Sequence, residues 1–294
     1  MKKPHRDHDR LTRPLIFGLP LFLAIPCSFS MAQAVTPITP SGLNTYIGAP
    51  TTLPGGEIVY DITGGTRPGN GPNLFHSFGD LKVPSNNIAN FLNDSGLPTS
   101  NILGRVTGGN ISNIFDTVQT TGFENANLFL MNPAGFLFGP TATVNIGGMM
   151  TFTSANYLKV ADGVRFNAIP TASADLLLST APVAAFGFLG SKPGAITVQG
   201  SQLSVADDAG ISLVGGNITV QAGTLTAPSG DVTLISVGKP SNPTVGGKSS
   251  SRGLDRGQDS LRPAFEVWGP SIFRKAALLT PAQPQTAQVW PGAC

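Results

Sequence analysis

A short strand-like motif recurs in this chain at a spacing of 22 residues. The tetrapeptide Ile-Thr-Val-Gln occurs at residues 196–199 and again at 218–221, and Leu203 recurs as Leu225. A fixed period of this size is typical of solenoids, in which each period forms one coil that stacks on the next. In both copies an apolar side chain alternates with a polar one, as in a strand with one buried face. The repeat therefore predicts a parallel β-helix.

We extend this prediction to an all-β fold over residues 35–238, a right-handed, single-stranded parallel β-helix (a pectin-lyase-like solenoid) with capping strands. At about 22 residues per coil, this region makes about nine coils. Residues 35–60 are expected to cap the N-terminal end, and residues 71–125, richer in Asn and Pro, are expected to carry excursions from the helix. A β-sandwich is the alternative for short strands at such spacing, but it has no reason to repeat a strand in phase.

Residues 127–148 combine two apolar runs with a turn. The runs at 128–131 and 136–138 suit strands that are buried on both faces. Between them lies Asn-Pro-Ala-Gly at 132–135, which is type I turn chemistry: the Asn can bond its own backbone, the Pro presets φ, and the Gly ends the turn. A third strand is expected at 142–146, where apolar and polar residues alternate.

These residues resemble the haemagglutination-activity domain of filamentous-haemagglutinin-like exoproteins, which leave Gram-negative bacteria by two-partner secretion. The core of that family is Asn-Pro-Asn-Gly followed by an aliphatic strand. Here Asn132, Pro133 and Gly135 match, whereas Ala134 replaces the second Asn and Phe136 replaces the usual aliphatic residue. Further matches to cyanobacterial-type members are GPNLFHSF at 71–78, GRVTGGNISNI at 104–114 and NIGG at 145–148.

The resemblance implies a non-enzymatic exoprotein whose β-helix domain is recognised by the POTRA modules of a cognate outer-membrane barrel transporter. It also implies an adhesin-like role, with a glycan or protein receptor on a host or cell surface. The signature residues are Asn132, Pro133 and Gly135, with Asn110 and Asn113 beside them. The same asparagines can also be read as residues that satisfy local backbone groups at turns. The signature thus serves folding, recognition, or both.

The N-terminus reads as a secretory signal peptide over residues 1–34. Basic residues are followed by an apolar stretch from Leu15 to Ile25 and then by Ala-Gln-Ala at 32–34. The apolar stretch is well short of the roughly 20 residues that a membrane-spanning helix needs. We therefore expect a protein that passes through the periplasm and is secreted or held at the cell surface. Cleavage after Ala34 removes Cys27 and leaves Cys294, so no intrachain disulfide is expected.

Charge separates the predicted folded region from the C-terminal part of the chain. Residues 35–238 hold six basic and eleven acidic residues, a net charge of −5, which argues against a nucleic-acid partner. From Lys239 the alternation stops, and residues 239–294 are predicted to be a disordered tail rich in Pro, Gly and Ser. This tail is read either as the end of a naturally short member or as the remnant of a truncated passenger.

Two alternatives compete with this function. One is an inactive fragment of a truncated exoprotein, and the other is a carbohydrate-active enzyme, because parallel β-helices also house polysaccharide lyases and hydrolases. Asp207 and Asp208 are the one adjacent carboxylate pair of the folded region, and we expect them at a solvated corner. His76 is the one histidine after the signal peptide and has no nucleophile or carboxylate placed beside it by sequence. No calcium-loop pattern is present. The sequence therefore predicts no catalytic residue, no cofactor and no metal site.

Overall fold

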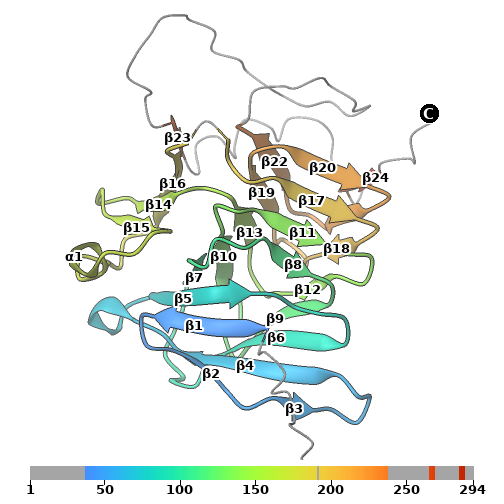
Figure 1. Cartoon of the computed structure of the whole chain (residues 1–294), viewed down its shortest axis with the longest axis horizontal. Helices are drawn as coiled ribbons and strands as arrows, with labels where there is room; N and C mark the ends of the chain where they lie inside the picture. The colour runs from blue at the N-terminus through green and yellow to red at the C-terminus, as the bar shows by residue number, and fades with distance from the viewer. Residues whose placement is uncertain (1–36, 191, 238–264, 269–284, 289–294) are drawn as a thin grey trace, which may run out of the picture. The chain divides into compact units, whose positions relative to one another are not determined.

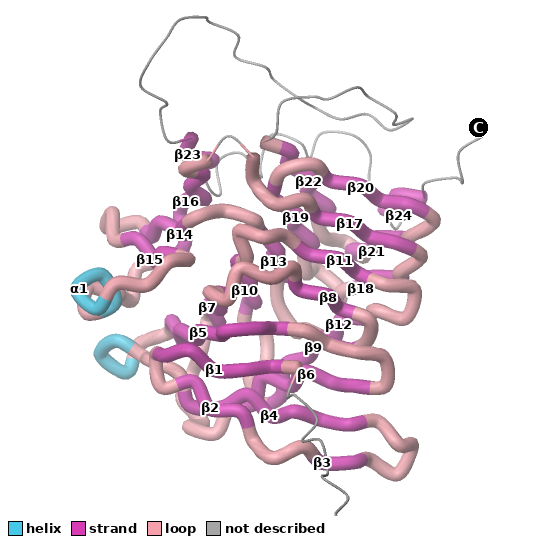
Figure 2. The backbone as a smooth tube through the Cα atoms, viewed as in Figure 1, coloured by secondary structure: helices cyan, strands magenta, loops and turns pink. Residues whose placement is uncertain are grey.

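The computed structural model describes residues 37–190, 192–237, 265–268 and 285–288 (Figure 1). The predicted signal peptide and most of the predicted tail lie outside these residues. In the described part, successive coils bring strands into parallel pairs, so that sheets run along the stack (Figure 2). The parallel β-helix predicted from the repeat is therefore confirmed.

Three sheets of the solenoid are named by letter. Sheet A contains the parallel strands β5 (Asn73–Leu81), β7 (Asn101–Val106), β10 (Asn127–Met131), β13 (Met150–Thr153), β19 (Ile211–Gly215) and β22 (Val232–Ser236). Sheet B contains the parallel strands β4 (Ile58–Gly64), β6 (Asn87–Leu92), β9 (Thr117–Thr121) and β12 (Thr143–Asn145). Sheet C contains the parallel strands β8 (Ser112–Ile114), β11 (Phe136–Phe138), β17 (Ile196–Gln199) and β20 (Ile218–Gln221).

The repeat that led to the fold prediction is in register in the structure. Ile196 of β17 pairs with Ile218 of β20, and Val198 pairs with Val220. Two further parallel strands, β18 (Gln202–Ser204) and β21 (Thr224–Ala227), stack Leu203 on Leu225. Parallel pairing between consecutive copies excludes the β-sandwich alternative, which is built from antiparallel sheets.

The predicted N-terminal cap is present. Strand β1 (Ile38–Gly42) pairs antiparallel with β5, and β2 (Thr45–Ile47) and β3 (Thr51–Thr52) both pair antiparallel with β4. These strands cover the open ladders of the first coil, which would otherwise expose unpaired backbone groups. A 3₁₀ turn, η1 (Pro68–Asn70), lies between β4 and β5.

The expected number of coils was wrong. Sheet A has seven strands, of which β1 is antiparallel, so its six parallel strands mark about six coils rather than nine. The first coils are longer than the repeat, because stacked asparagines at their starts lie 28 residues apart for Asn73 and Asn101 and 26 apart for Asn101 and Asn127. A large insertion also intervenes, since Met150 pairs directly with Ile211.

That insertion was expected in the wrong place. Residues 71–125 form the regular strands β5 to β9, and the excursion from the helix lies instead at residues 157–188. The excursion comprises β14 (Tyr157–Val160), β15 (Arg165–Asn167), α1 (Ala172–Asp175) and β16 (Val183–Phe188). Its strands pair antiparallel with one another. Several asparagines in this range begin strands, among them Asn73, Asn87 and Asn101, which is why their abundance misled the prediction.

Two antiparallel pairs involve the C-terminal part of the chain. Strand β23 (Phe265–Trp268) pairs with β16, and β24 (Gln285–Gln288) pairs with β21. Neither pair is a parallel coil of the solenoid. The disordered tail predicted for residues 239–294 stays a prediction, because most of those residues lie outside the described part of the chain and the two described segments are strands.

Apolar side chains form two separate cores on the two faces of sheet A. Leu128 and Leu130 of β10 point into the solenoid, where they join the main cluster. Phe129 and Met131 of the same strand point outward and pack with the excursion in a second cluster. The apolar run at 128–131 is thus buried on both faces, as predicted. The run at 136–138 differs, because Leu137 is only half-buried between its two phenylalanine neighbours.

Candidate recognition corner

The Asn-Pro-Ala-Gly segment forms the predicted turn. The backbone N–H of Gly135 donates to the carbonyl of Asn132 at 2.8 Å, which closes a four-residue β-turn. The Oδ1 atom of Asn132 accepts a hydrogen bond from the N–H of Ala134 at 3.0 Å, an Asx-turn inside the β-turn. Gly135 has a φ of 101°, a conformation that a residue with a side chain rarely adopts. The local conformation of the turn therefore explains why Asn stands at its first position and Gly at its last.

Neighbouring coils hold this turn on both sides. The Nδ2 atom of Asn132 donates to the carbonyl of Asn110 and to the Oγ of Ser112, both at 2.9 Å, in the preceding coil. On the following coil, Gly194 N–H donates to the carbonyl of Pro133 at 3.1 Å. A Cβ atom on Gly135 would overlap the carbonyl oxygen of Ala195. The turn is a stacked corner whose shape is set by three successive coils.

The predicted signature residues differ in exposure. Asn132 has no exposed surface and Gly135 is buried, whereas Pro133 is half-buried. Asn110 is exposed, and its Nδ2 atom donates to Asp80 at 2.9 Å. Asn113 is half-buried in β8. The fold brings Asn110 and Asn132 into direct contact, while Asn113 pairs with the middle residue of β11, beyond the turn.

An asparagine ladder was not recognised in the sequence. Asn127 donates to Asn101 at 3.0 Å, and Asn101 donates to Asn73 at 2.8 Å, at the starts of β10, β7 and β5. Asn73 in turn donates to the carbonyls of Ser179 and Ala181 in the excursion. The spacings of 28 and 26 residues hid the ladder, because neither fits the 22-residue period of the later coils.

A buried arginine was also missed. Arg105 of β7 is 1% exposed, and its two terminal nitrogens each donate to one oxygen of Asp175 at 2.7 Å. It also donates to the carbonyl of Asn167 at 3.1 Å and to the Oγ of Ser77 at 2.9 Å. The sequence contained a signal, since Arg105 is one of six basic residues in the folded region and lies in an apolar strand. Buried charges of this kind need a dedicated partner.

The residues weighed for catalysis lie apart. His76 is 1% exposed between the rings of Phe78 and Phe91, and its Nδ1 atom has no hydrogen-bond partner among the described residues. Desolvation by burial, with a smaller contribution from Arg67, lowers the pKa of His76 to about 3. The two adjacent aspartates, 207 and 208, lie at an exposed turn, as expected. In the described part of the chain, no three His, Cys, Asp or Glu side chains are grouped to hold a metal ion.

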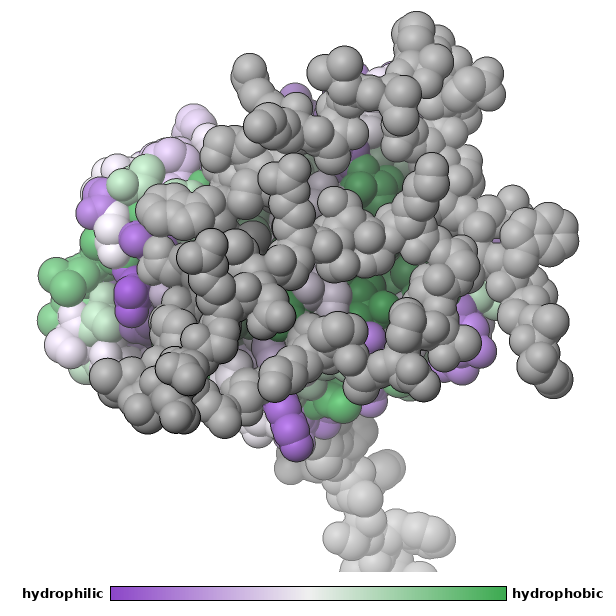
Figure 3. All heavy atoms as spheres, turned by 90° about the horizontal axis from the view of Figure 1, so that it is seen from above, coloured by the Kyte–Doolittle hydropathy of each residue, from purple (hydrophilic) through white to green (hydrophobic). Residues whose placement is uncertain are grey.

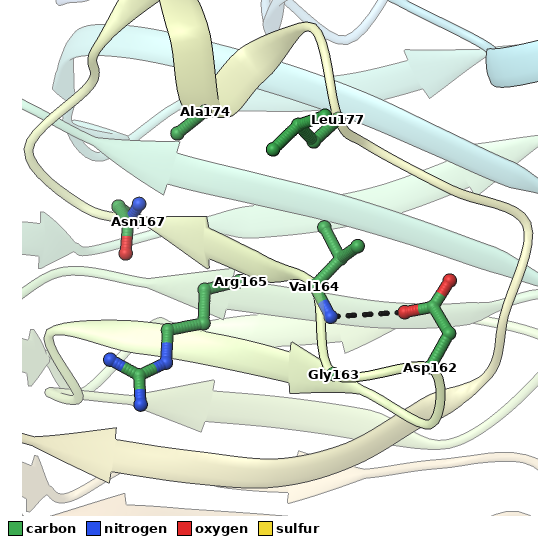
Figure 4. Close-up of a pocket in the computed structure, with 7 residues that line it drawn as sticks. All are labelled: Asp162, Gly163, Val164, Arg165, Asn167, Ala174 and Leu177. Carbon is green, nitrogen blue, oxygen red and sulfur yellow. Dashed lines mark hydrogen bonds between the residues drawn. The ribbon is translucent and has the colours of Figure 1, made fainter.

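A shallow depression of about 410 Å³ lies on the excursion (Figure 4). Its polar side chains do not converge, because the carboxylate of Asp162 and the guanidinium of Arg165 extend in different directions. A hydrogen bond from the Ser179 side chain, and another from the N–H of Val164, lower the pKa of Asp162. The depression therefore does not have the convergent polar groups of a catalytic pocket.

Apolar side chains are exposed at the outer end of the excursion. Ile169, Leu176 and Leu177 expose 78%, 86% and 65% of their surface. Figure 3, which looks down on the molecule, shows apolar surface at the left edge, the side on which Figure 1 places α1. These residues were not singled out from the sequence.

Comparison with known proteins agrees with this architecture. The family model of the TPS secretion domain matches residues 38–256, which include nearly the whole described solenoid. No curated protein matches the chain in sequence. No helix among the described residues is long and apolar enough to span a membrane. The match covers most of the chain, and the chain therefore belongs to the TPS secretion domain family of two-partner secreted exoproteins.

Proposed function

We propose that this protein is a non-enzymatic exoprotein that a POTRA-containing outer-membrane transporter recognises through the segment from Asn110 to Gly135. After export through the periplasm it has an adhesin-like role outside the cell, with a glycan or protein receptor. The family membership implies secretion and a transporter partner. The recognition segment and the adhesin role are our proposals.

The recognition segment lies within the residues that match the family, and the burial of Asn132 limits when the transporter can reach it. Its side chain has no exposed surface, and its amide nitrogen donates two hydrogen bonds inside the corner. A partner can therefore contact that side chain only before the coils stack. In an unstacked chain the backbone groups of β10 and β11 are also unpaired, and a sheet edge of the transporter can capture them by β-augmentation. These features favour recognition of the unfolded chain.

Export assays with the cognate transporter test the proposal. We expect Asn132→Ala to reduce the amount of protein in the medium, and Asn217→Ala, which changes an exposed asparagine before β20, to leave it unchanged. Restoring the family residue with Ala134→Asn should be neutral or helpful. Normal export of Asn132→Ala would place the signal elsewhere, first at Asn110 and Asn113.

Refolding of the same purified variants separates recognition from folding. If Asn132→Ala refolds at the normal rate but is not exported, the transporter reads the side chain. If refolding and export both fail, the segment acts through the formation of the corner. A variant that is exported normally but refolds slowly would argue against recognition through Asn132.

A lack of catalysis is part of the proposal. Asp207 and Asp208 are exposed at a turn, and His76 is buried in the core between aromatic rings. Incubation of the purified protein with acidic and neutral polysaccharides provides the test. Reproducible cleavage that is abolished by Asp207→Asn with Asp208→Asn would establish the enzyme alternative.

A further inference from the structure

The excursion covers the outer face of the first coils. Phe75 of β5, Leu103 of β7 and Met131 of β10 point away from the solenoid interior and are fully buried. They belong to one cluster with apolar side chains of the excursion, among them Leu158, Phe166 and Phe186. If the excursion were absent, these three large side chains of sheet A would face water. Because the unfolded chain exposes the same side chains, the first coils would lose the stabilisation that this burial provides.

Polar contacts tie the same strands to the excursion. The guanidinium of Arg105 forms a two-pronged ion pair with Asp175, 70 residues later in the chain, and its Cζ lies 5.1 Å from the ring centre of Phe166. The amide of Asn73 donates to the carbonyls of Ser179 and Ala181, 106 and 108 residues later. These partners of Arg105 and Asn73 lie in the excursion and in no earlier coil.

The order of the chain makes this dependence asymmetric. If only the residues before the excursion fold, the side chain of Arg105 faces water and lacks its ion pair with Asp175, so the first coils lose that stabilising contact as well. The amide of Asn73 also loses both carbonyl partners. Several contacts that stabilise the first coils are therefore made only when the excursion has folded.

We propose that the excursion is a folding clamp: β5, β7 and β10 reach stable coils only when residues 157–188 close over sheet A. Folding of the solenoid then does not proceed coil by coil from the N-terminus. If the transporter of the proposed function passes the chain N-terminus first, the first coils stay unfolded until about residue 190 has emerged. This last consequence rests on the proposed function, whereas the folding order does not.

Native-state hydrogen exchange of the full chain tests the clamp. We expect Asp175→Ala to raise exchange rates on the order of 10- to 100-fold, both in the excursion and in β5, β7 and β10, because it leaves Arg105 unpaired. The control is Asp207→Ala, which removes an exposed carboxylate at a turn outside the excursion. Faster exchange confined to residues 157–188 would overturn the proposal.

A double variant tests whether the charge is the cause. Arg105→Met combined with Asp175→Leu removes both charges and keeps apolar contact, so it should recover most of the protection that Asp175→Ala loses. Failure of the double variant to recover protection in β7, while Asp207→Ala stays normal, would count against the ion pair as the coupling element.

Pulse-labelled refolding of the unmodified full chain keeps the proposal testable if the variants do not fold. Amides of β5, β7 and β10 should become protected in the same kinetic phase as those of β14 and β16. Protection of β5 to β10 in an earlier phase would refute the clamp. If the unmodified chain refolds in this coupled way but the cognate transporter does not export it, only the proposed function is refuted.

Discussion

The first and the last coils of the solenoid differ in how they are stabilised. In the first coils, β5, β7 and β10 are covered on both faces, and polar ladders connect them. In the last coils the tetrapeptide of β17 recurs unchanged in β20, yet Ile218 and Val220 are only half-buried, whereas Ile196 and Val198 are fully buried. Among the described residues, β20 is the terminal strand of sheet C and has a neighbouring strand on one side.

Sequence regularity and burial are therefore separate properties in this solenoid. The coils that repeat best in sequence include half-buried positions of the terminal strand. The coils that repeat poorly carry Arg105, Asn132 and the asparagine ladder, all of which depend on distant partners. Long-range partners relax the need for a strict local period, because each coil is fitted to its neighbours individually.

The strongest effect is expected at the corner between the two regions. Gly135→Val should destabilise the protein by at least about 3 kcal/mol, since the φ of 101° disfavours a β-branched residue and its Cβ would overlap Ala195. Urea unfolding followed by circular dichroism measures the change. A shift below about 1 kcal/mol would mean that this corner can relax, and that the coils on its two sides are less tightly stacked than the contacts indicate.

Matched substitutions in the two copies of the repeat are expected to lower the free energy of unfolding by different amounts. Ile196→Asp buries an unpaired charge and should cost about 3 kcal/mol, while Ile218→Asp, at a half-buried position of the terminal strand, should cost about half as much or less. Both variants are measured by urea unfolding under the same conditions. Equal costs would show that β20 is covered in solution, which would remove the difference between inner and terminal coils.

Acid should weaken the first coils through His76. Its folded-state pKa of about 3 lies below the unfolded value near 6.5, so the unfolded state binds the proton first and stability falls as pH drops below 6.5. The expected slope is at most about 1.4 kcal/mol per pH unit, and the interval from about pH 6.5 to about pH 5 avoids most carboxylate titration. His76→Leu should flatten the curve in this interval. An unchanged slope in that variant would assign the acid sensitivity to other groups.

The weakest effect is expected at the exposed turn of the last coils. Asp207→Asn with Asp208→Asn should change stability by less than about 0.5 kcal/mol, because both side chains are exposed. Asp208 has a φ of 61°, and Asn tolerates that conformation as well as Asp does. A larger loss, again from urea unfolding, would reveal a structural role for these carboxylates.

Local sequence patterns were enough to specify the class of fold and the shape of the candidate corner. Alternation at 196–199 and 218–221 predicted parallel strands, and the residue types at 132–135 predicted the turn, because both signals are local in the chain. The cap at the N-terminus was also predictable from its position ahead of the first regular strand. The roles of Asn110, Asn113, Asn132, Pro133 and Gly135 in partner recognition stay a prediction.

The number of coils, the location of the excursion and the burial of Asn132 depended on tertiary contacts. The excursion returns to sheet A because Phe166, Asp175 and Ser179 find partners in β5, β7 and β10, up to 106 residues away. Each of these contacts joins two different residue types and occurs once. Such pairings therefore leave no periodic pattern in the sequence. Local patterns specify how a strand or a turn forms, whereas the free energy of long-range burial decides which strands lie together.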